Sequence, residues 1–216
     1  MNLSFDLEIS KNMPRPTKKS TRIKLRILDN AVSEFASNGL KGTSVNTIAH
    51  RSGVSKSQLY YYFSNKESLY EKTLVHMIHI WQDLFKIENT DDGPENFMRA
   101  YIKRKMRLFF EHPEIAQLYS NEIAQGAPFL RKHWHLSKTQ FDIGIKQINE
   151  WVGQGLMDPI DPQLLQLTVL GVTEFYGLHA TQVRFLTGCD ENSQFDFEYY
   201  THEVTNLILK GCGIKF

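Results

Sequence analysis

The chain has few of the features that mark secreted, metal-binding or membrane-spanning proteins. Its 216 residues include only two cysteines, Cys189 and Cys212, which are too few for a disulfide framework or for a zinc site without histidines at ligand spacing. No stretch reaches the roughly 18 to 20 apolar residues of a membrane span. The first residues lack the basic start and apolar core of a secretory signal. We therefore expect reduced thiols in a cytoplasmic protein that holds no metal and contacts no membrane.

Motifs of common enzymes are also missing. The chain contains no GxSxG nucleophile elbow, no HExxH metalloprotease helix and no phosphate-binding loop. His133 and His135 are two residues apart, a spacing that does not place them on one face of a helix. We therefore expect no catalytic residues and no cofactor, and an enzyme is the weaker of the alternatives for this chain.

Strand-like alternation of polar and apolar residues does not persist anywhere, and no internal repeat or low-complexity tract is visible. Apolar residues instead recur at spacings of three and four, which is typical of helices with one buried face. The best candidate for a linker is NTDDGP, Asn89 to Pro94. The expected fold class is all-α, with helices over 20–37, 44–51, 56–62, from 65 onward, 95–111, 113–124, 128–153, 162–187 and 196–210.

The charge is unevenly distributed, although the net charge is only +1. Residues 11–72 hold twelve Lys or Arg and four Asp or Glu, a net of +8. Residues 73–216 hold thirteen basic and eighteen acidic residues, a net of −5, and residues 1–10 add −2. A basic segment on a mildly acidic body is typical of a face that binds a polyanion, but a solvated basic surface has the same composition.

The most informative stretch is residues 43–69, TSVNTIAHRSGVSKSQLYYYFSNKESL. It predicts two short helices joined at Ser52-Gly53, where glycine tolerates a positive φ, with Ser55 as the cap of the second helix. Leu59 and Phe63 would bury one side of that helix and leave the other for the major groove of DNA. The predicted contacts, from side chains and from helix N-termini, are Thr43, Ser44, Ser55, Lys56, Ser57, Gln58, Tyr61, Tyr62 and Lys66.

These contacts would have different roles. The amide of Gln58 can both donate to and accept from a base edge. Tyrosine hydroxyls and Lys66 can bind phosphates and set the register on the duplex. Burial and DNA contact both remain open for Tyr60, because it directly follows Leu59. The alternative for the other tyrosines is a place in the core, and the alternative for Lys66 is a solvated surface position.

The segment GLKGTSVNTIAHRSGVSKSQLYYYFSNKESL resembles the N-terminal domain of the TetR family of bacterial transcriptional regulators. The departures are Ser52, where alanine is usual, and Ser57, where glycine or proline is common. The resemblance implies a flexible arm over 1–17, a three-helix DNA-binding domain over 18–64, and a helical effector-binding and dimerisation domain over 65–216. By motif position it carries over as DNA contacts Ser44, Asn46, Ser55, Lys56, Gln58, Tyr60, Tyr61, Tyr62 and Lys66, with Asn46 at a variable position.

The helix expected over 162–187 is apolar nearly all round, which indicates burial on more than one side. One side would face its own domain and the other a second subunit. Together with the helix at 196–210 it would form a four-helix homodimer interface, as the family uses. A central helix of a monomer is the alternative.

A weaker resemblance covers residues 119–212, where YSNEIAQGAPFL, LGVTEFYGLHATQVRFLTG and EVTNLILKGC look like the branch of the family that regulates pyrimidine utilisation. That branch has a Thr-Gln pair in its ligand region, and the matching pair here is Thr173-Glu174. A neutral amide suits a nucleobase edge, whereas a carboxylate makes a cationic or hydrogen-bond-donating ligand equally reasonable. The candidate pocket residues are Asn121, Glu122, Trp134, Glu174, Tyr176 and His179.

Each pocket candidate has a structural alternative. A buried carboxylate must be paired, hydrogen-bonded or protonated, so Glu174 could equally form an internal ion pair. His179 could be a core or interface histidine, and Trp134 and Tyr176 could be core aromatics. The expected function is a homodimeric repressor that a small effector releases from a near-palindromic operator. An activator of the same architecture, or a helix-turn-helix module that binds protein, are the other candidates.

Overall fold

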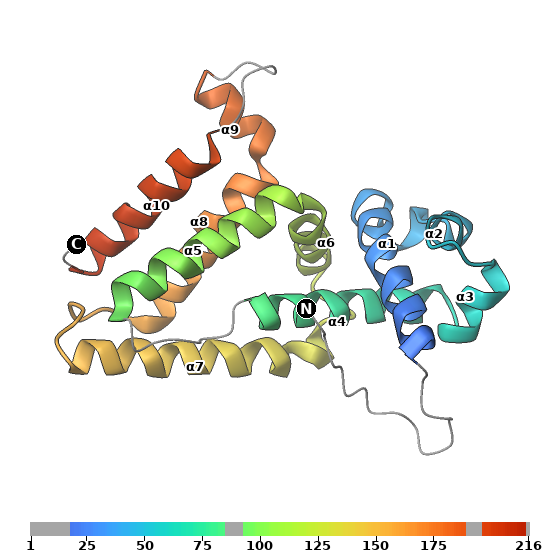
Figure 1. Cartoon of the computed structure of the whole chain (residues 1–216), viewed down its shortest axis with the longest axis horizontal. Coiled ribbons are helices and arrows are strands. Elements are labelled where there is room, and N and C mark those ends of the chain that lie inside the picture. Colours follow the sequence, from blue (N-terminus) through green and yellow to red (C-terminus); the bar gives the residue numbers. More distant parts are fainter. Residues whose placement is uncertain (1–17, 85–92, 189–195, 215–216) are drawn as a thin grey trace.

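A computed structural model describes residues 18–84, 93–188 and 196–214, and within these ranges the chain is helical with no strand (Figure 1). The expected arm at 1–17 and Cys189 lie outside the described residues. Most of the expected linker at 89–94 does too, and its last two residues, Gly93 and Pro94, already belong to a helix. The all-α fold class is confirmed.

The N-terminal part of the chain forms a compact head of three helices, α1 (Lys18–Gly42), α2 (Val45–Arg51) and α3 (Lys56–Tyr62), followed by the long α4 (Lys66–Leu84). Figure 1 shows this head at one end of the molecule, with α4 running from it into the body. The apolar stripe that the sequence predicts is buried, and its fully enclosed members include Ile27, Phe35, Ile48, Leu59, Phe63, Leu69 and Leu74.

The end of α1 differs from the expected stop at residues 38 and 39. The chain kinks at Gly39, with φ 63° and ψ 177°, and then makes one more helical turn to Gly42. That combination of angles is essentially restricted to glycine. The extra turn is held because the backbone N–H of Thr43 donates to the Gly39 carbonyl at 3.2 Å.

The body contains α5 (Gly93–Glu111), α6 (Pro113–Ala124), a 3₁₀ turn η2 (Arg131–His133), α7 (Trp134–Gly153), α8 (Pro162–Leu178), α9 (Ala180–Leu186) and α10 (Phe197–Gly211). Helices α5, α7, α8 and α10 share a second apolar core, whose members include Phe97, Ile102, Ile148, Trp151, Leu165, Val169 and Leu209.

Two predicted helices differ from the structure: one begins later than expected, and the other is divided into two helices. The helix expected over 128–153 begins only at Trp134, because residues before it form a turn at Ala127, with φ 56°, and the short η2. The helix expected over 162–187 is broken at His179, with φ −113° and ψ 28°. Apolar residues continue on both sides of that break, so their spacing gives no sign of it.

Polar contacts tie the head to the body along α4. Glu122 of α6, expected in the pocket, instead accepts three hydrogen bonds: from the Tyr70 hydroxyl at 3.0 Å, from Phe129 N at 2.7 Å and from Leu130 N at 3.2 Å. Its carboxylate is therefore fully used in joining α4, α6 and the turn before α7. The side chain of Gln82 donates to the Leu136 carbonyl at 2.9 Å and so joins α4 to α7 as well.

Candidate DNA-binding surface and effector cavity

The turn between α2 and α3 is fixed by local hydrogen bonds. Gly53 has φ 60°, its N–H donates to the His50 carbonyl at 3.0 Å, and Val54 N donates to the Ala49 carbonyl at 3.0 Å. This is the Schellman arrangement, which needs a left-handed residue directly after the helix. Ser52 lies inside the turn, and its buried hydroxyl has no hydrogen-bond partner.

Helix α3 presents the polar face that the sequence predicts. Ser55 caps it, because its Oγ accepts a hydrogen bond from Gln58 N at 3.1 Å. Leu59 is completely buried beneath the helix. Exposed side chains remain on the outer side, and Tyr61 projects furthest among the tyrosines with 73% of its surface exposed. The exposed set comprises Ser55, Lys56, Ser57, Gln58, Tyr60 and Tyr61.

Tyr62 differs from its two neighbours. It is half-buried against the core of the head, and its ring meets that of Tyr61 edge-on, with 5.2 Å between the ring centroids. It therefore combines the core position and the surface position that the sequence left as alternatives. For Tyr60 the structure favours the surface, since 38% of its area is exposed.

The remaining expected contacts flank α2 and α4. Ser44 and Asn46 are exposed, and the Ser44 side chain makes no capping bond to α2, so its hydroxyl is available. The Lys66 ammonium donates to the Lys41 carbonyl at the end of α1, at 2.9 Å. An ammonium has three donors, so this bond leaves Lys66 able to bind a phosphate as well.

The expected contact from Thr43 is not supported by its position. The side chain is 4% exposed, and its hydroxyl donates to the Glu34 carbonyl at 3.0 Å and to the Gly39 carbonyl at 2.7 Å. Thr43 therefore locks the end of α1 to the start of α2 and does not present its hydroxyl to DNA.

Some basic side chains of the head interact with other residues of the head. Arg51 forms an ion pair with the nearly buried Glu34, with 2.7 Å between their charged atoms, and so joins α2 to α1. The ammonium of Lys24 lies 5.9 Å from the centre of the Phe63 ring. Burial, and secondarily the charge of Lys72, lower the pKa of Lys24.

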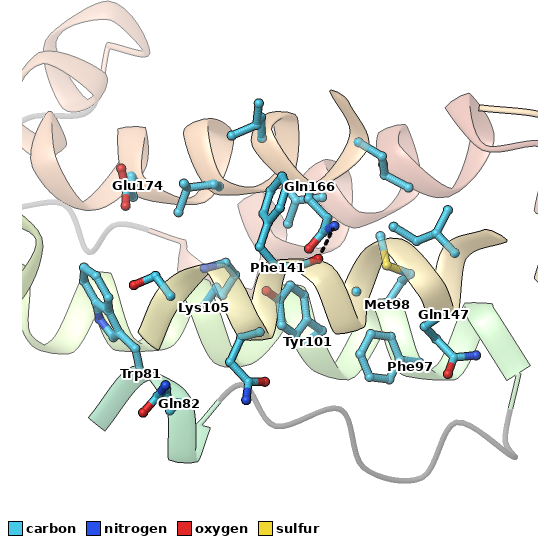
Figure 2. A pocket seen from close by; sticks show the side chains of 18 of the residues that line it. Trp81, Gln82, Phe97, Met98, Tyr101, Lys105, Phe141, Gln147, Gln166 and Glu174 are labelled. Atoms are coloured by element: carbon cyan, nitrogen blue, oxygen red, sulfur yellow. Dashed lines mark hydrogen bonds between the residues drawn. The ribbon is translucent and has the colours of Figure 1, made fainter. Parts of the chain in front are cut away.

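A cavity of about 210 Å³ lies in the body between α4, α5, α6, α7 and α8 (Figure 2). Its walls are mainly aromatic and aliphatic. Seven polar side chains also reach it, from Gln82, Lys105, Ser137, Gln140, Gln147, Gln166 and Glu174. A concave and mostly apolar site with a few polar groups is the usual form of a small-molecule site.

Two oppositely charged side chains dominate the electrostatics of this cavity. Lys105 is 6% exposed, and burial lowers its pKa to about 8, an effect that the carboxylate of Glu174 partly offsets. Burial raises the pKa of Glu174, and the charge of Lys105 opposes that rise. The Lys105 ammonium also lies 5.5 Å from the centre of the Tyr101 ring and 5.6 Å from that of Phe109, in the range of cation–π attraction.

Two buried polar atoms, on residues that line the cavity, lack hydrogen-bond partners. The Oε1 atom of Glu174 and the Nε1 atom of Trp81 are both buried, and neither is hydrogen-bonded to any described residue. Buried polar groups are usually satisfied, and leaving one unsatisfied costs free energy. Both atoms are covered by surrounding protein atoms, so each carries that cost in the folded chain.

Of the residues expected in the pocket, only Glu174 lines the cavity. Asn121 donates to the Ala36 carbonyl at 3.3 Å and joins α6 to α1. Trp134 is 43% exposed at the start of α7. Tyr176 packs on Tyr200, and His179 stacks on Phe175 with 4.8 Å between ring centroids. The expected ligand contacts from Asn121, Trp134, Tyr176 and His179 are therefore not supported, because none of these side chains lines the cavity.

Sequence reasoning missed Lys105 and Trp81. A signal for Lys105 was present, since Ile102, Lys105 and Phe109 follow one another at spacings of three and four on the buried face of α5. A lysine at such a position is expected to be paired or functional. Thr173, the neighbour of Glu174, instead points into the helix and donates to the Val169 carbonyl at 2.8 Å.

In the part of the chain that the structure describes, no group of three or more His, Cys, Asp or Glu side chains could hold a metal ion. No described helix has the length and apolar composition needed to cross a membrane.

Comparisons with known proteins identify both halves of the chain. Residues 27–73 match the family described as bacterial regulatory proteins, tetR family, and residues 74–215 match the YcdC-like protein, C-terminal region. The transcriptional regulator RutR of Escherichia coli K12 is 32% identical over 189 residues, which cover 87% of this chain and 89% of RutR.

A second relative and a solved structure agree with this family assignment. IcaR of Staphylococcus epidermidis, a negative transcriptional regulator of the biofilm operon icaADBC, is 25% identical over 205 residues, which cover 87% of this chain and all of IcaR. The structure of SCO4942 from Streptomyces coelicolor has the same fold, with a TM-score of 0.72, 17% identity, and coverage of 89% of this chain and 99% of that one. The chain therefore belongs to the TetR family of bacterial transcriptional regulators, which are DNA-binding proteins and not enzymes.

Proposed function

We propose that this protein is a homodimeric repressor that binds a near-palindromic operator and leaves it when a small effector enters the cavity. The observation that carries the proposal is the path of α4. This helix begins at the head, where Lys66 holds the end of α1, and ends at the cavity, where Trp81 and Gln82 line the wall. A change in the cavity can therefore shift the helix that supports the head.

Exposed apolar residues support a dimer through α8 and α10. On α8 they are Leu164, Leu167 and Phe175, at spacings that place them along one side of the helix. On α10, Leu207 is 71% exposed and Tyr199 is 56% exposed. Apolar area exposed on two helices is typical of an interface between proteins. Pairing of α8 and α10 with the same helices of a second copy would cover it.

Such a dimer carries two recognition helices related by a twofold axis. Half-sites read by two such helices lie about 34–36 Å apart, one turn of DNA, or a multiple of that. Gln58 is the residue best placed by its chemistry to read a base. Ser44, Tyr61 and Lys66 supply phosphate contacts that fix the register.

The sign of regulation follows from the comparison with IcaR, which is a negative regulator. Effector and operator binding are coupled reciprocally, and a coupling of about 1–3 kcal/mol would be ordinary. An activator of the same architecture would show the opposite dependence of transcription on the effector, while its DNA-binding surface would be the same.

The experiment that tests the proposal combines selection of DNA from a random library with a dimer-breaking variant. We expect a palindromic consensus and an affinity that falls steeply with salt, through release of counterions. Leu207→Glu should convert the dimer to a monomer in analytical ultracentrifugation and abolish tight operator binding. Gln117→Glu, which introduces the same charge at an exposed position of α6, is the matched control.

A selection that yields no consensus, or an affinity that does not depend on salt, would contradict DNA binding and favour a helix-turn-helix module that binds protein. A Leu207→Glu variant that remains dimeric would contradict the proposed interface. Metabolites are then added to the complex of protein and operator to test release. The proposed repressor requires that the effector weakens operator binding.

A further inference from the structure

We infer that α1 provides a second DNA-contact surface beside the helix-turn-helix, a row of four cations that binds phosphates of the operator backbone. The row consists of Lys18, Lys19, Arg22 and Arg26, and we call it the α1 cation row. The inference rests on the proposed function, because it concerns the same DNA. It adds a surface outside α2, α3 and the start of α4, and the segment that resembles the family begins only at Gly39, after all four residues.

The α1 cation row lies on one side of the helix, opposite the core of the head. An α-helix turns by about 100° per residue, so residues 18, 22 and 26 follow one another along the helix, and all four cations fall within an arc of about 100°. Ile27 and Phe35, which are completely buried, belong to the other side. Three of the four cations are exposed, and Arg26 is partly exposed. The row is therefore open to a partner along about 12 Å of helix.

No acidic residue compensates the row. Residues 18–28 contain no Asp or Glu, and the carboxylate of Asp29, the first acid of α1, is bonded to His76 of α4 at 2.8 Å. Within the described residues, none of the four cations forms an ion pair, a side-chain hydrogen bond or a cation–π contact. Arg51 differs from them, because it is paired with Glu34. The charge of the row is therefore not used inside the head.

The electrostatics of the free protein disfavour this arrangement. The N-terminus of a helix is the positive end of its dipole, which favours carboxylates and disfavours cations, yet the first turn of α1 holds no acid. Lys18 and Arg22 are four residues apart, as are Arg22 and Arg26, and like charges at this spacing destabilise a helix. Pairs of opposite charge are what stabilises an exposed helix at the same spacing. A polyanion would remove both the repulsion and the unfavourable interaction with the dipole.

The row borders the part of the head that is expected to read DNA. A guanidinium nitrogen of Arg26 lies 3.7 Å from the point that a Cβ atom on Gly53 would occupy. Gly53 belongs to the turn between α2 and α3, two residues before Ser55, the cap of α3. Figure 1 shows α1 beside α2 and α3 in the same head, at the end of the molecule away from α10.

This position makes duplex DNA the partner of the row. A helix in the major groove has the phosphate backbones of the two strands on either side of it. Each strand carries one phosphate per roughly 3.4 Å of duplex axis, so a row about 12 Å long matches about three or four phosphates. An acidic protein would match the charge of the row, but nothing would bring it to the border of α3.

The test measures the salt dependence of DNA binding by the full-length double variant Lys18→Gln/Arg22→Gln. Fluorescence anisotropy is recorded with two duplexes of equal length, the operator selected from the random library and a scrambled duplex of the same composition. Each phosphate contact contributes about 0.9 to the slope of log K against log salt concentration, so we expect the slope to fall by about 1.8 on both duplexes. At about 0.1 M salt this corresponds to a roughly 60-fold loss of affinity on both.

Two control variants isolate the effect of charge at this place. Lys18→Arg/Arg22→Lys keeps both charges and should keep the wild-type slope. Lys138→Gln/Lys146→Gln removes the same charge from exposed positions of α7 and should also keep it. Thermal unfolding shows whether each variant is folded. The variant Lys18→Gln/Arg22→Gln should unfold at a temperature no lower than wild type, because it relieves repulsion between like charges.

Two results with a folded variant would overturn the inference. A wild-type slope and affinity in Lys18→Gln/Arg22→Gln would mean that the row is only a solvated surface. A loss confined to the selected operator would exclude phosphate contacts, because phosphates carry no sequence information.

Failure of this inference can be separated from failure of the proposed function. If the selected operator is bound and is released by a metabolite while the double variant behaves as wild type, the α1 cation row is wrong and the repressor proposal stands. If no consensus is selected, but the scrambled duplex is bound with a slope that the double variant reduces, the row stands and the repressor proposal fails. Binding of neither duplex by the wild type would overturn both.

Discussion

Replacing Lys105 by methionine is the most informative single change to the folded protein. Methionine has nearly the same length and shape as the lysine stem, so Lys105→Met removes the buried charge with little change in packing. Lysine has a pKa of 10.5 in the unfolded chain, and burial lowers it to about 8 in the folded protein. This difference corresponds to roughly 3 kcal/mol of destabilisation while the lysine is charged in both states.

The sign of the pH dependence follows from proton binding. Below pH 8 both states hold the proton, and the full cost of the buried charge is present. Between pH 8 and pH 10.5 the unfolded chain binds more protons than the folded protein, so the contribution of Lys105 to stability improves as the pH rises. Between pH 7 and pH 9 the improvement amounts to about 1 kcal/mol.

Urea unfolding at pH 7 and pH 9 measures this effect. We expect Lys105→Met to be more stable than wild type by roughly 2–3 kcal/mol at pH 7. The gap should narrow by about 1 kcal/mol at pH 9, because only the wild type gains from deprotonation. Titrating groups that do not interact with Lys105 cancel in the comparison, whereas Glu174 loses the positive charge that opposes the rise in its pKa. Lys146→Met, at a position 80% exposed in the wild type, is the control and should show no such convergence. A variant less stable than wild type, or a gap independent of pH, would refute the burial of a charged lysine.

Four further predictions concern the head and its attachment. Ser52→Ala should raise the free energy of unfolding by about 1 kcal/mol in urea titrations, because it removes a buried hydroxyl that has no partner; a loss of stability would mean that the hydroxyl is hydrogen-bonded. Glu122→Gln should cost about 2–3 kcal/mol in the same assay, since an amide cannot accept from Tyr70 and two backbone N–H groups as strongly as a carboxylate does, and an unchanged midpoint would contradict that role. Gln58→Ala should relax base preference at one position per half-site in repeated library selection, and an unaltered preference profile would exclude a base contact. Lys66→Ala should weaken all DNA sequences about equally and flatten the salt dependence of binding, whereas a sequence-selective loss would exclude a phosphate contact.

The DNA-binding half was largely predictable from the sequence. The positions of α2 and α3, the capping of α3 by Ser55 and the left-handed Gly53 depend on residues within a few positions of each other. Local hydrogen bonds and apolar spacing decide such features, so a single sequence contains them. Thr43 was the exception, because its hydroxyl is taken up by Glu34, nine residues away on α1.

The effector half was predictable in outline only. The sequence indicated an all-α body and Glu174 in the cavity, and the rest of the wall had to be found in the structure. Glu122 and Asn121 looked available in the sequence, yet distant partners take up their polar atoms: the Tyr70 hydroxyl on α4 for Glu122, and the Ala36 carbonyl on α1 for Asn121. The residues that neighbour Glu122 and Asn121 in the sequence do not indicate these distant partners.

The sequence by itself determined where most helices begin and end, which faces they bury, and that one short helix is fit to read DNA. Only the tertiary structure decided which polar side chains meet in the cavity and which are used up in holding helices together. Lys105 and Glu174 are 69 residues apart in the chain and line the same cavity because α5 and α8 pack against each other. Helix formation depends on short-range bonds, whereas the contents of a cavity depend on how distant helices pack.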